Sequence, residues 1–400
     1  MTTRIYYTDP YCRRFDARVT DAFDLDRRPA VVLDRTAFYP SSGGQPFDVG
    51  RLGGAAVVDV ADDERGVVHV LSAPLAAGAA VGGEIDWARR FDHMQQHTGQ
   101  HLLSAAFDRL FENQTVGFHM GAETSTIDLA REASHDELAR AEDEANRIVW
   151  EDRDVSIRFV DPSRCDPSGP TLQLRKESAR EGVLRLIEVA GFDLSACGGT
   201  HVARTGAIGM IAVTADEKIR GGTRITFVCG DRAQRVFRTL RESVTGATRA
   251  LSVLPAALPA AIERMQVEAR DLRRTVKRLQ EATAAHEAGR LTRESSEVSG
   301  VRIVTAALDH WDAGGLKTIA AIIVTTTPAV VALVSSSAPF DVVIARSPDV
   351  SVAAHQVLRA LLDRFGGRGG GKPDLAQGGG LAGDAGTILD AARRLISDPS

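Results

Sequence analysis

The sequence predicts a multidomain α+β protein in which strand-rich and helix-rich stretches follow one another along the chain. Short β-branched runs separated by glycine and aspartate occur first, helical periodicity begins near Phe91, and a long helical stretch later separates two regions of mixed character. The length of 400 residues is enough for two to four domains. We therefore expect four regions: residues 1–90, 91–235, 236–296 and 297–400.

Residues 1–90 are expected to form a small domain made of strands. The segments PAVVLDRTAFYP and GRLGGAAVVDVADDERGVVHVL combine β-branched runs with glycine and aspartate, which favour turns. Short strands at this spacing are typical of a small barrel or a sandwich, and the pattern leaves both architectures open.

Residues 91–235 are predicted to be an α+β region with an antiparallel sheet. The segment HTGQHLLSAAFDRLF is expected to be a helix, because it places apolar or small residues at helical spacing. In a second helix, SHDELARAEDEANRIVWEDRDV, Ser134 is the expected N-cap and Glu137 completes a capping box. ETSTIDLA and the glycine-separated runs after the second helix are expected to be strands.

The remaining two regions are expected to be a helical arm and a C-terminal α/β domain. From Ile262 to Leu279, apolar or small residues recur at alternating spacings of three and four, which is typical of a short coiled coil or a helical hairpin. An amphipathic helix packed on its own domain is the alternative. Strands and a helix follow from about Val298, and the glycine-rich stretch Gly366–Gly380 is expected to be a loop before a final helix.

The composition, with 44% hydrophobic and 25% charged residues, is that of an ordinary globular protein. No stretch resembles a signal peptide or reaches the roughly 20 apolar residues of a membrane span, so we expect a cytoplasmic protein with no membrane partner. A net charge of −5 means that a nucleic-acid partner would need local basic patches. The four cysteines do not suggest a disulfide framework: Cys12, Cys165, Cys197 and Cys229.

Two pairs of residues have the types and the spacing of metal ligands. His97 and His101 lie four apart on one predicted helix, so they project in the same direction. Cys197 and His201 have the same spacing around two glycines, whose flexible backbone lets a thiolate and an imidazole converge. Three histidines and one cysteine fit Zn²⁺ by ligand type. Two further histidines are possible substitutes but belong to no matched pair: His93 and His119.

The motifs resemble those of a known family. QQHTGQHLLS followed by CGGTH resembles the editing domain of alanyl-tRNA synthetases and the free-standing editing proteins of the AlaX type. LDRTAFYPSSGGQPFDVG (Leu33–Gly50) is similar to the glycine motif of that family, and FGGRGGGKPDLAQGGG resembles the C-terminal domain that alanyl-tRNA synthetases share with DHH-type phosphoesterases. The order of all four motifs matches. The resemblance implies the long form: a small β-barrel, a zinc-binding editing domain, a helical arm and a C-terminal glycine-rich domain.

The resemblance also implies an activity, the hydrolysis of the ester bond of mischarged tRNA(Ala), above all Ser-tRNA(Ala) and also Gly-tRNA(Ala). Serine is alanine with an added hydroxyl, and a pocket for a small side chain rejects such a near-isostere only weakly, so a second site is needed. One zinc ion per chain would either activate a water on the ester or position the substrate. We expect positioning, because four protein ligands leave no open coordination site.

Individual site residues are expected by the same resemblance, with His97, His101, Cys197 and His201 as the zinc ligands. The expected catalytic residues are Thr36, whose hydroxyl would recognise the hydroxyl of serine, and Gln45, which would contact the amino acid or the 3′ end. The structural alternatives are a strand-end threonine and a turn-stabilising glutamine. The expected substrate-binding glycines, which would permit close approach of the backbone, are Gly43 and Gly44, with Ser42 where the family often has a third glycine.

Two regions are candidates for contact with the tRNA. The arm carries basic residues that would follow phosphates or form a solvated face: Arg270, Arg273, Arg274, Lys277 and Arg278. The C-terminal loop offers Arg368 and Lys372 to a phosphate or an RNA end. Either region would equally suit a homodimer.

Two features limit the expected activity. The glycine motif begins within 40 residues of the N-terminus, so we expect no aminoacylation domain. The sequence has no Asp-His-His triplet, so phosphoesterase activity of the DHH type is not expected. A non-catalytic, zinc-dependent protein that binds tRNA or another partner is the alternative function.

Overall fold

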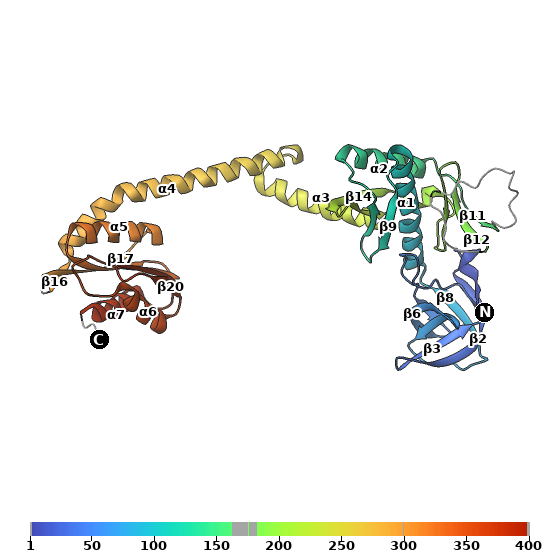
Figure 1. The fold of residues 1–400 in the computed structure, drawn as a ribbon, viewed down its shortest axis with the longest axis horizontal. Helices are drawn as coiled ribbons and strands as arrows, with labels where there is room; N and C mark the ends of the chain where they lie inside the picture. The colour runs from blue at the N-terminus through green and yellow to red at the C-terminus, as the bar shows by residue number, and fades with distance from the viewer. Residues whose placement is uncertain (1, 162–174, 176–181, 299, 398–400) are drawn as a thin grey trace. The chain divides into compact units, whose positions relative to one another are not determined.

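The computed structural model describes residues 2–161, 175, 182–298 and 300–397, so Cys165 lies outside the described residues. The chain divides into two compact units, Met1–Gly246 and Ala247–Ser400, which can be followed by colour in Figure 1. Helices and mostly antiparallel sheets occur in both units, which confirms the multidomain α+β class. The finer division into four domains stays a prediction.

Six strands of the first unit close into a barrel, in the region where the sequence predicts a barrel or a sandwich. Neighbouring strands are antiparallel, and buried and exposed side chains alternate along β8, so one face of the strand lies in the barrel core. The order around the barrel is β2-β3-β7-β6-β5-β8. The bounds are β2 (Arg14–Leu25), β3 (Arg28–Leu33), β5 (Gly50–Leu52), β6 (Ala55–Asp63), β7 (Gly66–Leu71) and β8 (Ala80–Ile85), and the short strands β1 (Thr3–Arg4) and β4 (Arg35–Thr36) pair in parallel.

The chain continues from the barrel into two helices packed on a four-stranded antiparallel sheet of order β14-β15-β10-β9. The first helix begins after Asp86, whose carboxylate accepts a hydrogen bond from the Arg89 amide. The second begins with the predicted capping box of Ser134 and Glu137, which is confirmed. The bounds are α1 (Trp87–Phe111), α2 (His135–Trp150), β9 (Thr115–Met120), β10 (Ser125–Leu129), β14 (Ile211–Ile219) and β15 (Gly222–Cys229).

A three-stranded antiparallel sheet of order β11-β12-β13 completes this region. Its strands are β11 (Val155–Val160), β12 (Leu184–Val189) and β13 (Asp193–Ala196). The end of β13 leads directly into the CGGTH segment, where the Cys197 amide donates to the Arg185 carbonyl. The sheet therefore fixes where this turn begins.

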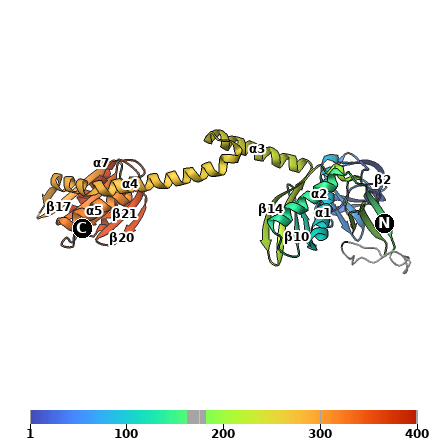
Figure 2. The same ribbon diagram turned by 90° about the horizontal axis from the view of Figure 1, so that it is seen from above.

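The expected arm contains α3 (Asp231–Leu251) and α4 (Leu258–Glu294). The last turns of α4 bury Leu291 and its neighbours in a core shared with α5, and Figure 2 shows α4 and α5 side by side. The predicted heptad positions earlier in α4 are exposed, from 43% at Ile262 to 61% at Leu272. Packing of α4 on its own domain therefore buries only the last turns of this helix. A coiled-coil partner for the exposed earlier turns stays a prediction.

The C-terminal domain is a six-stranded mixed sheet with helices on both faces. The order is β16-β17-β18-β19-β21-β20. The strands β17 and β18 are parallel, and α5 provides the crossover connection that parallel neighbours require. One apolar core includes residues of α4 and α5 and the other includes residues of α6 and α7. The bounds are β16 (Ser296–Val298), β17 (Val301–Leu308), α5 (Ala313–Thr326), β18 (Ala329–Ser335), β19 (Phe340–Arg346), α6 (Ala354–Phe365), β20 (Arg368–Gly371), β21 (Leu375–Leu381) and α7 (Ala385–Ser397).

The glycine-rich stretch is not the loop that the sequence suggested, because β20 and β21 pair as an antiparallel hairpin. Glycine is needed for this close pairing. A Cβ on Gly369 would lie 2.5 Å from the Gln377 carbonyl oxygen, and a Cβ on Gly371 would lie 2.3 Å from the Ala376 Cα. Glycine, read from the sequence as a loop signal, here allows two strands to approach each other. Within the described ranges, no helix combines the length and the apolar character needed to cross a membrane.

Candidate metal centre

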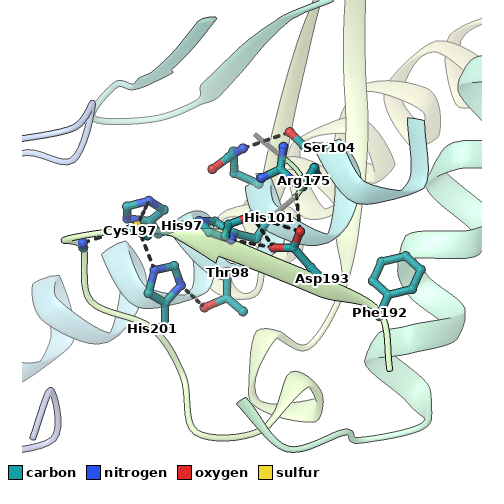
Figure 3. Close-up of polar contacts among 12 residues, drawn as sticks. His97, Thr98, His101, Ser104, Arg175, Phe192, Asp193, Cys197 and His201 are labelled. Carbon is teal, nitrogen blue, oxygen red and sulfur yellow. Dashed lines mark hydrogen bonds and ion pairs between the residues drawn. The ribbon is translucent and has the colours of Figure 1, made fainter. Parts of the chain in front are cut away.

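The structure brings together the four residues that form two pairs in the sequence. Their ligand atoms all lie within 4.8 Å of one another, at the contact between α1 and the turn after β13. Figure 3 shows the four side chains pointing toward a common centre. Three of them are buried and the cysteine is half-buried: His97, His101, His201 and Cys197. The other two histidines, His93 and His119, do not belong to this group.

The CGGTH turn needs a glycine where it faces the helix. A Cβ on Gly199 would lie 2.1 Å from Cε1 and 2.3 Å from Nδ1 of His97, a separation that real Cβ atoms do not show. The Gly199 amide also donates to the Cys197 sulfur at 3.4 Å, which favours the thiolate. The glycine therefore permits the close packing that brings the two ligand pairs together.

All three imidazoles are oriented by a hydrogen bond at Nδ1, which leaves Nε2 for an ion. Two of these nitrogens, Nε2 of His97 and Nε2 of His201, lie 3.4 Å from the Cys197 sulfur. The Nδ1 partners are the Gln45 Oε1 at 2.8 Å from His97, the Asp193 Oδ2 at 2.9 Å from His101 and the Thr98 Oγ1 at 3.2 Å from His201. Metal-bound histidines in proteins usually have such a partner, because it fixes the tautomer and the ring orientation.

The partner of His201 can act only as an acceptor. The Thr98 hydroxyl donates its single proton to the Met94 carbonyl at 2.8 Å. Its oxygen also accepts from the Val202 amide at 3.1 Å. His201 must therefore donate through Nδ1, so its Nε2 carries a lone pair toward the cluster.

The electrostatics of the cluster favour the metal-binding form at Cys197 and His201 but not at His101. Burial would raise the pKa of the Cys197 thiol, but the neighbouring His97 and His201 outweigh it and hold this pKa well below its ordinary value. Burial would lower the pKa of His101, but hydrogen bonds with Asp193 and Cys197 raise it to about 9, so this ring must release a proton when it binds a metal. Burial lowers the pKa of His201 to about 3. Three oriented imidazoles around a thiolate form a donor set that fits Zn²⁺.

A substitution at Asp193 would test whether zinc binding depends on the orientation of the His101 ring. Asp193 accepts from His101 through one oxygen and from Arg175 Nε at 2.8 Å through the other. We expect Asp193→Asn to weaken zinc binding by about 10- to 100-fold, the usual cost of altering a residue that orients a ligand. Competition with a chelator would measure this affinity. Asp128→Asn, which breaks an Asp–Arg pair with Arg224 outside the cluster, is the matched control, and equal affinities of the two variants would contradict the role of Asp193.

A cavity of about 590 Å³ opens beside the cluster. Its walls come from the glycine motif, α1, β9 and the β12–β13 hairpin, and they include His97, His101 and Cys197. A ligand in the cavity would therefore meet the cluster directly.

The two glycines of the motif have different surroundings. Gly43 lines the cavity with a φ of 57° and has open space where a Cβ would stand. Gly44 has a φ of 82°, and a Cβ there would lie 2.8 Å from the Phe118 carbonyl oxygen. Gly44 thus packs the motif against β9, whereas Gly43 faces the cavity. Ser42 has no positive φ and exchanges backbone hydrogen bonds with Gln45, so this turn does not require a glycine there.

The expected catalytic residues have structural partners. The Thr36 hydroxyl lies 2.8 Å from His69 Nε2, accepts from the Phe38 amide and is not among the residues that line the cavity. Burial lowers the pKa of His69 to about 4, so this ring is neutral at pH 7. Both ends of the Gln45 side-chain amide are hydrogen-bonded. Its Oε1 bonds to His97 and to the Thr200 amide, and its Nε2 donates to the Thr200 hydroxyl. These contacts favour an orienting role for Gln45 in place of a catalytic one.

The two expected residues of the glycine-rich stretch belong to the second compact unit. Arg368 is the first residue of β20 and Lys372 follows its last residue, and both are exposed. The Lys372 amide donates to the Leu375 carbonyl and closes the hairpin. Both side chains are accessible to a ligand, and their role stays a prediction.

Sequence reasoning missed Asp193 and Thr98. Asp193 lies four residues before Cys197, and a carboxylate near a predicted pair of metal ligands is a usable signal. Thr98 lies between the two histidines of α1 and resembles any helix threonine in sequence. Its role depends on a contact with a turn about a hundred residues away, which no local pattern contains.

Comparisons with known proteins identify two matching domains and several relatives of this chain. Residues 184–226, which include the CGGTH turn, match the second additional domain of threonyl and alanyl tRNA synthetases, and residues 300–398 match the DHHA1 domain. The fold and the site thus define a relative of the alanyl-tRNA synthetases. The chain is 31% identical over 390 residues to the alanyl-tRNA editing protein AlaX-L of Pyrococcus horikoshii, covering 94% of each chain. It belongs to this family of alanyl-tRNA editing proteins.

Synthetases and a solved domain are also similar. The chain is 30% identical to the alanine–tRNA ligase of Pyrococcus abyssi and 34% identical to that of Halorubrum lacusprofundi, and it spans 42% and 43% of their lengths. The crystal structure of the C-Ala domain of Aquifex aeolicus alanyl-tRNA synthetase matches 26% of this chain at 27% identity, with a TM-score of 0.25.

Proposed function

We propose that this protein hydrolyses the ester bond of mischarged tRNA(Ala), with Ser-tRNA(Ala) as the main substrate and Gly-tRNA(Ala) as a second one. The observation that carries the proposal is the buried cluster of three oriented histidines and Cys197 beside a cavity, in a chain related over 94% of its length to an alanyl-tRNA editing protein. We also propose that the protein acts in the cytoplasm, where its substrate is made.

The ligands would hold one Zn²⁺ ion, and the chain's own groups would do the rest. Bound there, zinc would supply a Lewis acid for the ester or an anchor for the substrate. The Gly43 backbone and the Gln100 side chain line the cavity and are in position to contact an aminoacyl group. Gln45, Asp193 and Thr98 hold the imidazoles, so they would act through the ligands and not on the substrate. Recognition of the serine hydroxyl by Thr36 stays a prediction.

The test is a paired deacylation assay. We expect rapid release of serine from Ser-tRNA(Ala) and slow release of alanine from Ala-tRNA(Ala), because an editing site must spare the correct product. Equal rates would contradict editing. The alternative, a non-catalytic zinc-dependent tRNA-binding protein, predicts tight binding of Ser-tRNA(Ala) with no release of serine.

The body of the tRNA and a second copy of the chain are the proposed partners. The exposed basic residues of α4 and the Arg368–Lys372 hairpin would contact phosphates. The exposed heptad positions of α4 would pair in a homodimer, because apolar residues at this spacing are the usual contact of a coiled coil.

A further inference from the structure

Gln100 is a buried polar residue on α1 whose amide can contact a specific group of the substrate. It lies between the ligands His97 and His101 in sequence, is only 6% exposed and lines the cavity beside the cluster. A buried amide normally satisfies both of its ends within the protein, because an unmade hydrogen bond there is costly.

Only one end of the Gln100 amide is satisfied within the described residues. Its Nε2 donates to the Ser104 Oγ at 2.8 Å, and the Thr115 Oγ1 lies 2.8 Å from the same oxygen. The amide is therefore held by a short chain of hydroxyls. Its Oε1 accepts no hydrogen bond from any described residue, and it is not one of the polar atoms that are sealed from solvent without a partner. This oxygen is thus a fixed acceptor with access to the cavity.

Several uncharged polar side chains near the cluster already donate their protons or use their amide groups within the protein, including Thr115, which donates to Ser104. Ser195 lines the cavity but donates its proton to Asp193. Gln45 is bonded at both ends, and the Thr36 hydroxyl has partners in the barrel. Gln100 Oε1 is thus a side-chain amide oxygen at the cavity that accepts from no described residue, and it can accept from a neutral donor.

The chemical groups at the aminoacyl end of the proposed substrates limit which donor Gln100 Oε1 would bind. Seryl, glycyl and alanyl esters share an ammonium group, a carbonyl and a ribose, and only the seryl group adds a side-chain hydroxyl. We infer that Gln100 Oε1 accepts a hydrogen bond from this hydroxyl and so determines the preference for the seryl ester. The inference rests on the proposed deacylase function and assigns to Gln100 the recognition that the sequence suggested for Thr36.

The test compares two substrates in each variant under single-turnover conditions. Gln100→Met keeps the length of the side chain and removes the acceptor. We expect the ratio of the rate for Ser-tRNA(Ala) to the rate for Gly-tRNA(Ala) to fall by about tenfold or more, with the glycyl rate nearly unchanged. Gln114→Met, at an exposed glutamine outside the cavity lining, is the matched control and should keep the ratio. A purely structural role of Gln100 would lower both rates together.

Several outcomes would overturn the inference. An unchanged ratio in Gln100→Met would do so, whether both rates keep the wild-type value or fall together, because the acceptor would then serve no group that only the seryl ester carries. A loss of the seryl preference in Thr36→Val but not in Gln100→Met would return the recognition to Thr36. If Gln100→Met does not fold, Ser104→Ala frees the same amide and should lower the same ratio. If the wild type hydrolyses neither ester, the proposed function fails, and the inference fails with it.

Discussion

Cys197→Ala is expected to abolish zinc binding and deacylation together. The thiolate is the one charged donor of the cluster, and both the His97 and the His201 Nε2 atoms lie 3.4 Å from its sulfur. We expect the affinity for zinc to fall by more than about 100-fold, because altering a residue that only orients a ligand already costs about 10- to 100-fold. Metal content after dialysis and the rate of serine release from Ser-tRNA(Ala) would be measured on the same sample.

Cys12→Ala provides the control for this variant. Cys12 is a half-buried thiol that packs against the barrel core, away from the cluster, so its replacement should leave metal content and rate unchanged. Full activity of Cys197→Ala with normal zinc content would show that the cluster is not the metal site.

Gly199→Ala is expected to disrupt the site without removing any ligand. Its Cβ would lie within 2.3 Å of two atoms of the His97 ring, so either the ring or the turn must move. His97 would then lose its position between Gln45 and Cys197. We expect a loss of zinc affinity of more than about 100-fold, comparable to removing a ligand. Zinc titration would report the loss directly.

Gly246→Ala is the matched glycine control. Gly246 lies inside α3 with nothing within 4 Å of an added Cβ, so alanine should be neutral or stabilise the helix by about 1 kcal/mol. Thermal unfolding of both variants separates local damage from global unfolding. Normal zinc binding by Gly199→Ala would mean that the turn tolerates the side chain and that the packing argument is incorrect.

The features that could be predicted from sequence are those with a local pattern. Spacing of four residues placed His97 with His101 and Cys197 with His201, and the structure joins the two pairs. The capping box of α2 was likewise readable, because it depends on residues three apart. Similarity of motif order was enough to propose the family, which the 31% identity to AlaX-L shows.

The features that could not be predicted depend on contacts between distant segments. Gln45 lies 52 residues from His97 in sequence, so its use as an Nδ1 partner follows only from how the glycine motif packs on α1. Thr36 lies in the glycine motif, but in the folded chain its hydroxyl is hydrogen-bonded to His69. The hairpin of β20 and β21 was expected to be a loop because glycine favours turns, whereas here it allows close pairing of strands. In each case, tertiary contact outweighs the local preference.

Three parts of the first compact unit contribute to the candidate metal site. The barrel supplies the glycine motif, α1 supplies two histidines and the β12–β13 hairpin positions the CGGTH turn. Each of the three histidines is oriented by a residue from a different segment, so we expect the cluster to form only when the first compact unit is folded. Metal binding should therefore stabilise this unit, since an ion that binds only the folded state shifts the folding equilibrium.

The most direct test of a zinc-dependent editing site is to measure zinc content and deacylation on one sample of the full chain, before and after chelation and after zinc is restored. We expect one zinc ion per chain at the start. Serine release from Ser-tRNA(Ala) should be lost with the metal and recovered with it, while Ala-tRNA(Ala) stays intact throughout. Serine release that continues at full rate from the zinc-free protein would contradict the proposed site.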